Sequence, residues 1–138
     1  MELGDLSVTL AEALGISNAN ERGNYAGTIL SDSKSASIAT ADVDTYAEGA
    51  SVQLSAGVWM VTVASNFASN ATEAIRRVQL YNKTNSASIY TSSEWDRYYV
   101  AHSFSWPIDL SAPATIAVRV SAGVTLTATT SIVAVRIA

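Results

Sequence analysis

The sequence lacks several residues on which common functions depend. It contains no cysteine, which excludes disulfides, thiolate zinc sites and thiol catalysis. Its single histidine, His102, cannot form a zinc site without further cysteine or histidine ligands. The longest apolar run, at about 58–63, is interrupted by Thr62 and is far shorter than the roughly 20 residues of a transmembrane helix. We therefore expect no metal, no cofactor and no membrane insertion.

Charge is also scarce. Charged residues make up 14% of the chain, lysine occurs only twice, and the net charge is −4. Acidic residues are concentrated in residues 1–50, and the arginines beyond residue 50 are scattered. A nucleic-acid partner requires a clustered basic face, so nucleic-acid binding is not expected. The first residues contain neither a basic segment nor an apolar segment, so we do not expect a secretory signal.

Small residues are abundant in the sequence. Alanine, serine and threonine account for 55 of the 138 residues, and 49% of the chain is hydrophobic. This length and composition predict one folded domain, not a disordered chain. A domain with so few charges is expected to expose apolar surface, and such surface normally marks an interface. Homo-oligomerisation is the simplest way to cover it.

The N-terminal region has a pattern of its own. In residues 5–14, apolar side chains recur at helical spacing, and residues 16–28 are rich in asparagine and glycine. A lone helix of this length is marginal unless its apolar stripe docks on a partner. We therefore predict an N-terminal arm and connector at 1–30, followed by one domain at 31–138. The anchoring residues would be Leu6, Leu10 and Leu14.

From about Ser35 onward the periodicity becomes two, which predicts strands. In one of them, alternate residues from Trp59 to Phe67 share a face, and in another so do alternate residues from Tyr98 to Trp106. No crossover helix fits between the strands, so a parallel α/β fold is excluded. Short strands separated by turns predict an all-β antiparallel jelly-roll sandwich. The expected strands are 36–46, 51–54, 58–67, 74–82, 87–91, 97–106, 115–120, 124–129 and 131–137.

Three segments carry a family resemblance. Ser51–Phe67 (SVQLSAGVWMVTVASNF) resembles the L-x-A-G-x-W/Y hairpin of jelly rolls such as tumour necrosis factor and the complement globular heads. It is most similar to the form found in bacteriophage fibre and tail proteins. Ile75–Thr84 (IRRVQLYNKT) resembles their next long strand and turn, and Ile132–Ala138 (IVAVRIA) resembles their last, central strand.

The resemblance implies an oligomeric particle protein. Such domains are usually homotrimers with aromatic and aliphatic residues packed around the threefold axis. The chain has no repeat shaft or heptads ahead of the domain, which favours a capsid decoration protein or a short head or tail fibre knob over a long fibre. It would lie on the virion surface, with other virion proteins bound by its N-terminal arm. The expected oligomer-interface residues are Trp59, Tyr98, His102, Phe104 and Trp106.

No pattern in the sequence indicates catalysis. The nucleophile elbow, the phosphate-binding glycine loop and the H-E-x-x-H motif are all missing, so we do not expect an enzyme. His102 lies on an apolar strand face, where a core or interface role outweighs a catalytic one. The acid pairs Asp42/Asp44 and Glu94/Asp96 could hold Ca²⁺ or act on glycosides, but solvated edge charges explain them better.

One aromatic segment could bind a ligand. Aromatic faces stack on sugar rings, and neighbouring Asp and Arg side chains bind hydroxyl groups, so this segment could recognise a host-surface glycan. The alternative is that these rings fill the core or the oligomer axis. The corresponding alternative function is a receptor- or glycan-binding head of a phage tail fibre. The candidate ligand-binding residues are Tyr90, Trp95, Arg97 and Tyr99.

Overall fold

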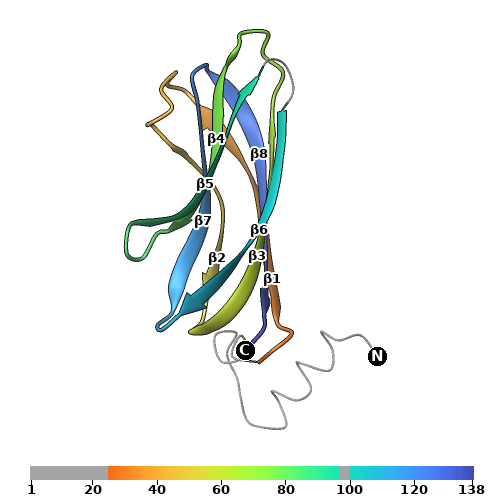
Figure 1. The fold of residues 1–138 in the computed structure, drawn as a ribbon, viewed down its shortest axis with the longest axis vertical. Coiled ribbons are helices and arrows are strands. Elements are labelled where there is room, and N and C mark those ends of the chain that lie inside the picture. The colour runs from red at the N-terminus through yellow and green to blue at the C-terminus, as the bar shows by residue number, and fades with distance from the viewer. Residues whose placement is uncertain (1–24, 97–99) are drawn as a thin grey trace.

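The computed structural model describes residues 25–96 and 100–138, which form eight strands in two packed antiparallel sheets (Figure 1). Sheet A has the strand order β1-β8-β3-β6, and sheet B has the order β2-β7-β4-β5. The strands are β1 (Ile29–Ile38), β2 (Ala47–Leu54), β3 (Gly57–Phe67), β4 (Ala74–Asn82), β5 (Ala87–Asp96), β6 (Val100–Leu110), β7 (Ala114–Ala122) and β8 (Leu126–Arg136).

The pairing of the strands is nested. β4 pairs with β5, β3 with β6, β2 with β7 and β1 with β8, and all these pairs are antiparallel. A long hairpin centred on the β4–β5 turn and rolled into two sheets gives this arrangement, which is the jelly-roll topology. The predicted all-β antiparallel jelly-roll sandwich is therefore confirmed.

The core lies between the sheets and follows the predicted alternation. On β3, Trp59, Val61, Val63 and Phe67 are fully buried, as are Ile116, Val118 and Val120 on β7. Successive side chains of a strand point to opposite faces, so these residues meet in one layer. The core also contains Ala36, Ile38, Val52, Leu54, Val78, Leu80, Val100, Ile108, Ala128, Ile132 and Ala134.

The strand prediction differs from the structure most clearly in two places. The first strand was expected at 36–46, but β1 is Ile29–Ile38 and residues 39–46 form a loop. In this loop the Asp42 carboxylate accepts hydrogen bonds from the Asp44 N–H and the Thr45 hydroxyl, both at 3.0 Å. The expected strands 124–129 and 131–137 are one strand, β8, which continues through its polar centre. Burial of Thr130 in that centre explains why the strand does not break there.

Strand β6 contains a proline in its interior. Pro107 is opposite Met60 of β3 and lies inside β6. The residue is tolerated because β6 is an edge strand, whose outer side has no neighbour to receive an N–H.

The predicted hairpin at 51–67 is wrong, because β2 and β3 lie in different sheets. The turn between them crosses the sandwich. Gly57 has a φ of 143°, and a Cβ there would lie 2.5 Å from Nη2 of Arg136. Nη1 of Arg136 donates to the Ser55 hydroxyl at 2.8 Å and to the Ala56 carbonyl at 2.7 Å. The glycine therefore gives the C-terminal arginine room to bind the turn.

A threonine joins the two sheets at the β1–β2 edge. The buried Thr130 hydroxyl accepts the Ala50 N–H from β2 and donates to the Lys34 carbonyl of β1, both at 2.8 Å. Residues 49–50 form a bulge in β2, and a Cβ at Gly49 would lie 2.4 Å from the Thr130 hydroxyl oxygen. Hydrogen bonds through Thr130 therefore link the two sheets at the β1–β2 edge. At the other edge, β5 and β6 are the last strands of different sheets and do not pair with each other. We call the β5–β6 edge the open edge.

Candidate functional site

The outward face of sheet A carries no charged side chain across its central rows. The strand register places four rows side by side on this face, from β1 through β8 and β3 to β6. We call these rows the uncharged face. They are Ile29-Val135-Met60-Pro107, Ser31-Val133-Thr62-Ser105, Ser33-Ser131-Ala64-Ser103 and Ser35-Thr129-Asn66-Ala101.

One end of the uncharged face is apolar. Ile29 is 60% exposed, Met60 37% and Val133 38%. Ile137 continues the alternation of β8 beyond Arg136, donates its N–H to the Val58 carbonyl, and is 51% exposed. In the described chain, only Trp95 and Trp106 are further large hydrophobic side chains with comparable exposure. Exposed apolar side chains gathered on one face mark an interaction surface.

The outward face of sheet B is covered by a charged network. The guanidinium of Arg119 lies 3.6 Å from the ring centre of Tyr81 and 4.6 Å from that of Tyr46. Its Nε also donates to the side-chain oxygen of Gln79 at 2.9 Å. The Ser121 hydroxyl donates to the Val43 carbonyl, so the 39–46 loop packs against this sheet. The polar side chains of this face therefore find their partners within the chain itself, and the 39–46 loop covers part of it.

Aromatic side chains fill the open edge between β5 and β6. Tyr90 of β5 stacks on Trp106 of β6 with ring centres 4.4 Å apart, and it meets Phe104 edge-on at 4.9 Å. Such pairs add about 0.5–1.5 kcal/mol beyond area burial. Trp106 remains 37% exposed. The rings hold the two edge strands together and leave one aromatic surface open to solvent.

His102 lies inside the same edge. Its Nδ1 is 3.3 Å from the Ser92 hydroxyl, its Nε2 is 3.6 Å from the Glu94 carboxylate, and its ring packs edge-on against Phe67. Burial lowers the pKa of His102, and the Glu94 carboxylate partly counters this effect. The residue types resemble those of an acyl-transfer triad. The imidazole, however, is 5% exposed. The geometry makes His102 a contact between the two edge strands.

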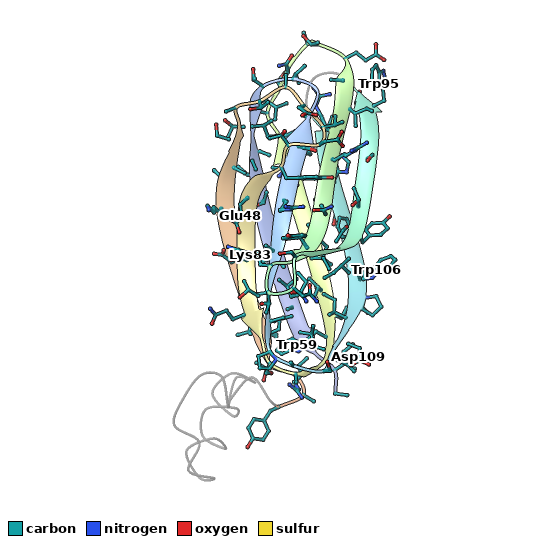
Figure 2. The ribbon with its side chains drawn as sticks, turned by 90° about the vertical axis from the view of Figure 1, so that its left-hand side faces the viewer. Glu48, Trp59, Lys83, Trp95, Trp106 and Asp109 are labelled. Atoms are coloured by element: carbon teal, nitrogen blue, oxygen red, sulfur yellow. The ribbon has the colours of Figure 1, made fainter. Side chains whose placement is uncertain are left out.

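The predicted glycan-binding residues do not form one group. Tyr90 and Trp95 are five positions apart in the regularly paired part of β5, so they point to opposite faces of the strand. Trp95 is 63% exposed and donates its indole N–H to the Glu73 carboxylate at 2.5 Å. Figure 2 shows Trp95 near one end of the sandwich and Trp106 nearer the other. Arg97 and Tyr99 lie outside the described residues.

The predicted oligomer-interface residues that the structure describes, Trp59, His102, Phe104 and Trp106, lie on the inward-facing positions of β3 and β6. Trp59 is fully buried in the core, where its indole N–H donates to the Ser55 carbonyl at 3.0 Å, so it has no surface for a second subunit. His102 is buried as well, whereas Phe104 is half-buried and Trp106 is exposed. Tyr98 lies outside the described residues. The sequence analysis missed the other set of alternate residues on the same strands. These residues point outward, and those in the four central rows carry no charge.

The acid pairs do not form a cation site. The Asp42 carboxylate already accepts hydrogen bonds from its own turn. The Asp44 carboxylate lies 3.2 Å from the Arg77 guanidinium. Glu94 faces His102, and the Asp96 carbonyl accepts from the Arg76 guanidinium. Across residues 25–96 and 100–138, no group of three metal-ligating side chains occurs. Nor does this part of the chain contain a helix long and apolar enough to cross a membrane. The expected anchor residues Leu6, Leu10 and Leu14 lie outside the described residues.

Comparisons with known proteins show similarity in fold only. No protein-family model matches the chain, and no curated protein matches its sequence. In the structure of infectious bursal disease virus Gx strain, one chain is similar with a TM-score of 0.56 and 9% identity, over 79% of this chain and 33% of that chain. A mutant VP2 protein of the same virus, in T=1 particles, gives 0.53 and 9%, over 79% and 32%. This chain therefore spans about a third of the length of those viral chains.

A third similar structure is a subunit of Bacillus endospore appendages. It has a TM-score of 0.46 and 12% identity, over 88% of this chain and 96% of that chain. The comparisons therefore show that this chain shares its fold with part of those two viral chains.

Proposed function

We propose that the chain is a non-enzymatic structural subunit of a virus particle, a surface-displayed jelly roll that forms homotrimers through its uncharged face. The observation that carries this proposal is the uncharged face itself, with Ile29, Met60, Val133 and Ile137 exposed at one end. The similarity in fold to the VP2 protein of a virus supports the particle setting. The bacteriophage setting and the threefold symmetry come from the sequence resemblance to fibre and tail jelly rolls.

Charge explains why a second copy fits this face. Each chain carries a net charge of −4, so two copies repel one another wherever charged surfaces meet. The uncharged face removes no charge from water when it is buried, and its serine, threonine and alanine side chains permit close approach. Interface cores are depleted of charge in the same way. Sheet B has no comparable face, since its outward side is occupied by Arg119 and the 39–46 loop.

The N-terminal arm would anchor the trimer to other virion proteins. The arm joins the sandwich beside the apolar end of the uncharged face, because Gly27 donates its N–H to the Arg136 carbonyl just before β1 begins. Residues 25–28 are therefore bound to the sandwich, and β1 starts at Ile29. A deletion that tests anchoring should remove residues 1–24 and leave this turn intact.

The test is the solution mass of the chain, measured by light scattering behind a sizing column. We expect three times the chain mass of 14.5 kDa. Thr62→Glu places a charge in the centre of the apolar end, where Thr62 is opposite Val133, and should give monomers. Thr91→Glu is the matched control, because Thr91 is an exposed, outward-facing threonine of sheet B. A monomeric wild type, or trimers that dissociate equally in both variants, would overturn the proposal.

A further inference from the structure

The edge strand β5 has backbone hydrogen-bonding groups on the side away from β4. On β4, the Ile75 carbonyl accepts the N–H of Gly123, so the backbone of Ile75 bonds toward β7. In an antiparallel pair, residues opposite each other either bond together or both point away. Trp95 is opposite Ile75 and therefore points its N–H and carbonyl away from β4. Thr91 and Ser93 do the same by alternation, and we call the backbone groups of these three residues the free edge of β5.

The other three edge strands are not open in this way. Thr130 links β1 to β2, and the Asp32 carboxylate of β1 accepts the Ser51 N–H of β2 at 3.0 Å. On β6, Pro107 interrupts the strand and has no N–H to donate. β5 contains no proline, and over residues 91–96 its pairing with β4 is regular. No segment of the described chain bonds to its free edge. A regular strand with unpaired backbone groups is a template for one more strand.

The accessible charges beside the free edge are acidic. Glu94 and Asp96 of β5 are exposed, on one face of the strand. Of the two arginines on β4, Arg76 is fully buried and Arg77 is paired with the Asp44 carboxylate. A second copy of the chain would bring the same acids near its own, and like charges on paired strands repel one another. These charges disfavour self-pairing and favour a basic strand from another polypeptide.

The opposite face of β5 is apolar and hydroxylic. Trp95 is exposed there, and its indole N–H donates to the Glu73 carboxylate, which holds the ring in place. Thr91 and Ser93 are exposed on the same face. Aromatic rings pair well with β-branched side chains on a neighbouring strand. The residue of an added strand that faces Trp95 would therefore be valine, isoleucine or threonine.

We propose that β5 accepts an extended segment of another protein as a fifth strand of sheet B, and that this segment alternates basic and β-branched residues. Its backbone would bond to Thr91, Ser93 and Trp95. Its β-branched side chains would pack on the face that carries Trp95, and its basic side chains would lie beside Glu94 and Asp96. In strand addition, main-chain bonds give affinity and side chains give specificity. The site does not use the uncharged face, so it holds whether or not the chain trimerises.

The experiment uses the isotopically labelled full chain and a short synthetic peptide, blocked at both ends, in which lysine alternates with valine and threonine. We expect saturating peptide to slow the amide hydrogen exchange of Thr91, Ser93 and Trp95 at least tenfold, as measured by NMR. A second peptide, with glutamate in place of each lysine, should not bind. Added salt should weaken the binding of the basic peptide, because the charges beside the free edge are exposed.

Two changes at one residue separate the backbone from the side chain. Ser93→Pro removes the central N–H of the free edge without removing a bond to β4, so it should weaken peptide binding at least tenfold. Ser93→Ala is the matched control, because it keeps that N–H and should bind as the wild type does. Glu94→Gln should weaken binding about threefold, as the loss of one exposed ion pair predicts. The thermal midpoint of each variant shows that it is folded.

Each other outcome overturns the proposal. Absence of binding at millimolar peptide does so, as does equal affinity for the glutamate peptide or unchanged affinity in Glu94→Gln. Binding that survives Ser93→Pro places the peptide elsewhere. Exchange that slows with protein concentration alone means that a second copy occupies the free edge. If Ser93→Pro fails to fold, a basic peptide whose β5-facing amide nitrogens are methylated decides in its place, and undiminished binding of that peptide overturns the proposal.

Discussion

The outward faces of the two sheets differ in how the chain treats them. On sheet B, Arg119 lies between Tyr46 and Tyr81, and the 39–46 loop packs against the strands. Outward-facing Ala117 and Ser121 of β7 are consequently buried within the monomer. On sheet A, four rows of small and apolar side chains face outward with no segment of the described chain recorded against them. The chain's own side chains and loop cover the outward face of sheet B, whereas the central rows of sheet A are uncharged and exposed.

The two faces also differ in how many charged side chains they carry. Arg77, Lys83 and Arg119 all point to the side of sheet B, where they pair with Asp44, Glu48 and Gln79 respectively. On sheet A the four central rows of outward-facing side chains are free of charge, and Asp109 is the next outward position of β6 beyond them. Free energy for assembly through that face then comes from area burial at about 25 cal/mol per Å², with no charge to desolvate.

The largest effect on stability is expected from the residue that joins the sheets. Thr130→Val keeps the side-chain shape but leaves the Ala50 N–H and the Lys34 carbonyl without their partner. Each unsatisfied buried group costs about 1–3 kcal/mol, so we expect a loss of about 3 kcal/mol in the free energy of unfolding. Urea denaturation followed by fluorescence measures it.

The adjacent residue provides the control for that prediction. Thr129 is exposed on the uncharged face, on the opposite side of the same strand. Thr129→Val should change the monomer's stability by less than about 0.5 kcal/mol. Equal losses in the two variants would mean that Thr130 does not join the sheets as described.

Removing Arg119 should expose the second face. Arg119→Ala deletes two cation–π contacts and the bond to Gln79, which is 6% exposed, so we expect a loss of about 2 kcal/mol. The oligomeric mass should stay that of the wild type, because sheet B is not the assembly face. Arg77→Ala, which removes only the partly exposed pair with Asp44, should cost about 0.5 kcal/mol or less. Dissociation of the oligomer by Arg119→Ala would contradict the contrast between the faces.

Much of the fold follows from alternation alone. The burial of alternate residues on β3 and β7 was predictable because one face of each strand must meet the other sheet. The link between the sheets at the β1–β2 edge was not predictable from alternation. Thr130 interrupts an apolar pattern, and only the fold places its hydroxyl between β1 and β2. For the same reason the sequence predicted two strands where β8 is continuous.

The candidate site was less predictable, because it depends on parity across strands. Tyr90 and Trp95 are close in sequence and were grouped together, but five positions along a regular strand place them on opposite faces. Tyr90 meets Trp106 through the open edge instead. Asn82 begins an Asn-Lys-Thr triplet, and only the fold shows that its buried side-chain oxygen closes the β4–β5 turn.

The open edge between the two faces should respond to pH. Because burial lowers the pKa of His102, this residue resists protonation in the folded chain, whereas the unfolded chain takes up a proton near the ordinary value of 6.5. The unfolded state then binds more protons, so the free energy of unfolding should fall as the pH decreases through 6.5 toward the lowered pKa. The groups facing the ring are Ser92, Glu94 and Phe67.

His102→Phe isolates that effect. The variant keeps an aromatic ring against Phe67 and cannot be protonated, so urea denaturation from about pH 8 to about pH 5 should show a shallower decline than in the wild type. Parallel curves would show that the protonation of His102 does not limit stability.

The smallest effect is expected from the ion pair that borders sheet B. Lys83 and Glu48 are 2.6 Å apart, and both side chains are more than 40% exposed. Water and salt screen such a pair, so Lys83→Ala and Glu48→Ala should each change the unfolding free energy by about 0.5 kcal/mol or less. A double-mutant cycle measured at low and at high salt should give a coupling energy that declines as salt is added. A large, salt-independent coupling would mean that this pair, and not Arg119, holds the second face together.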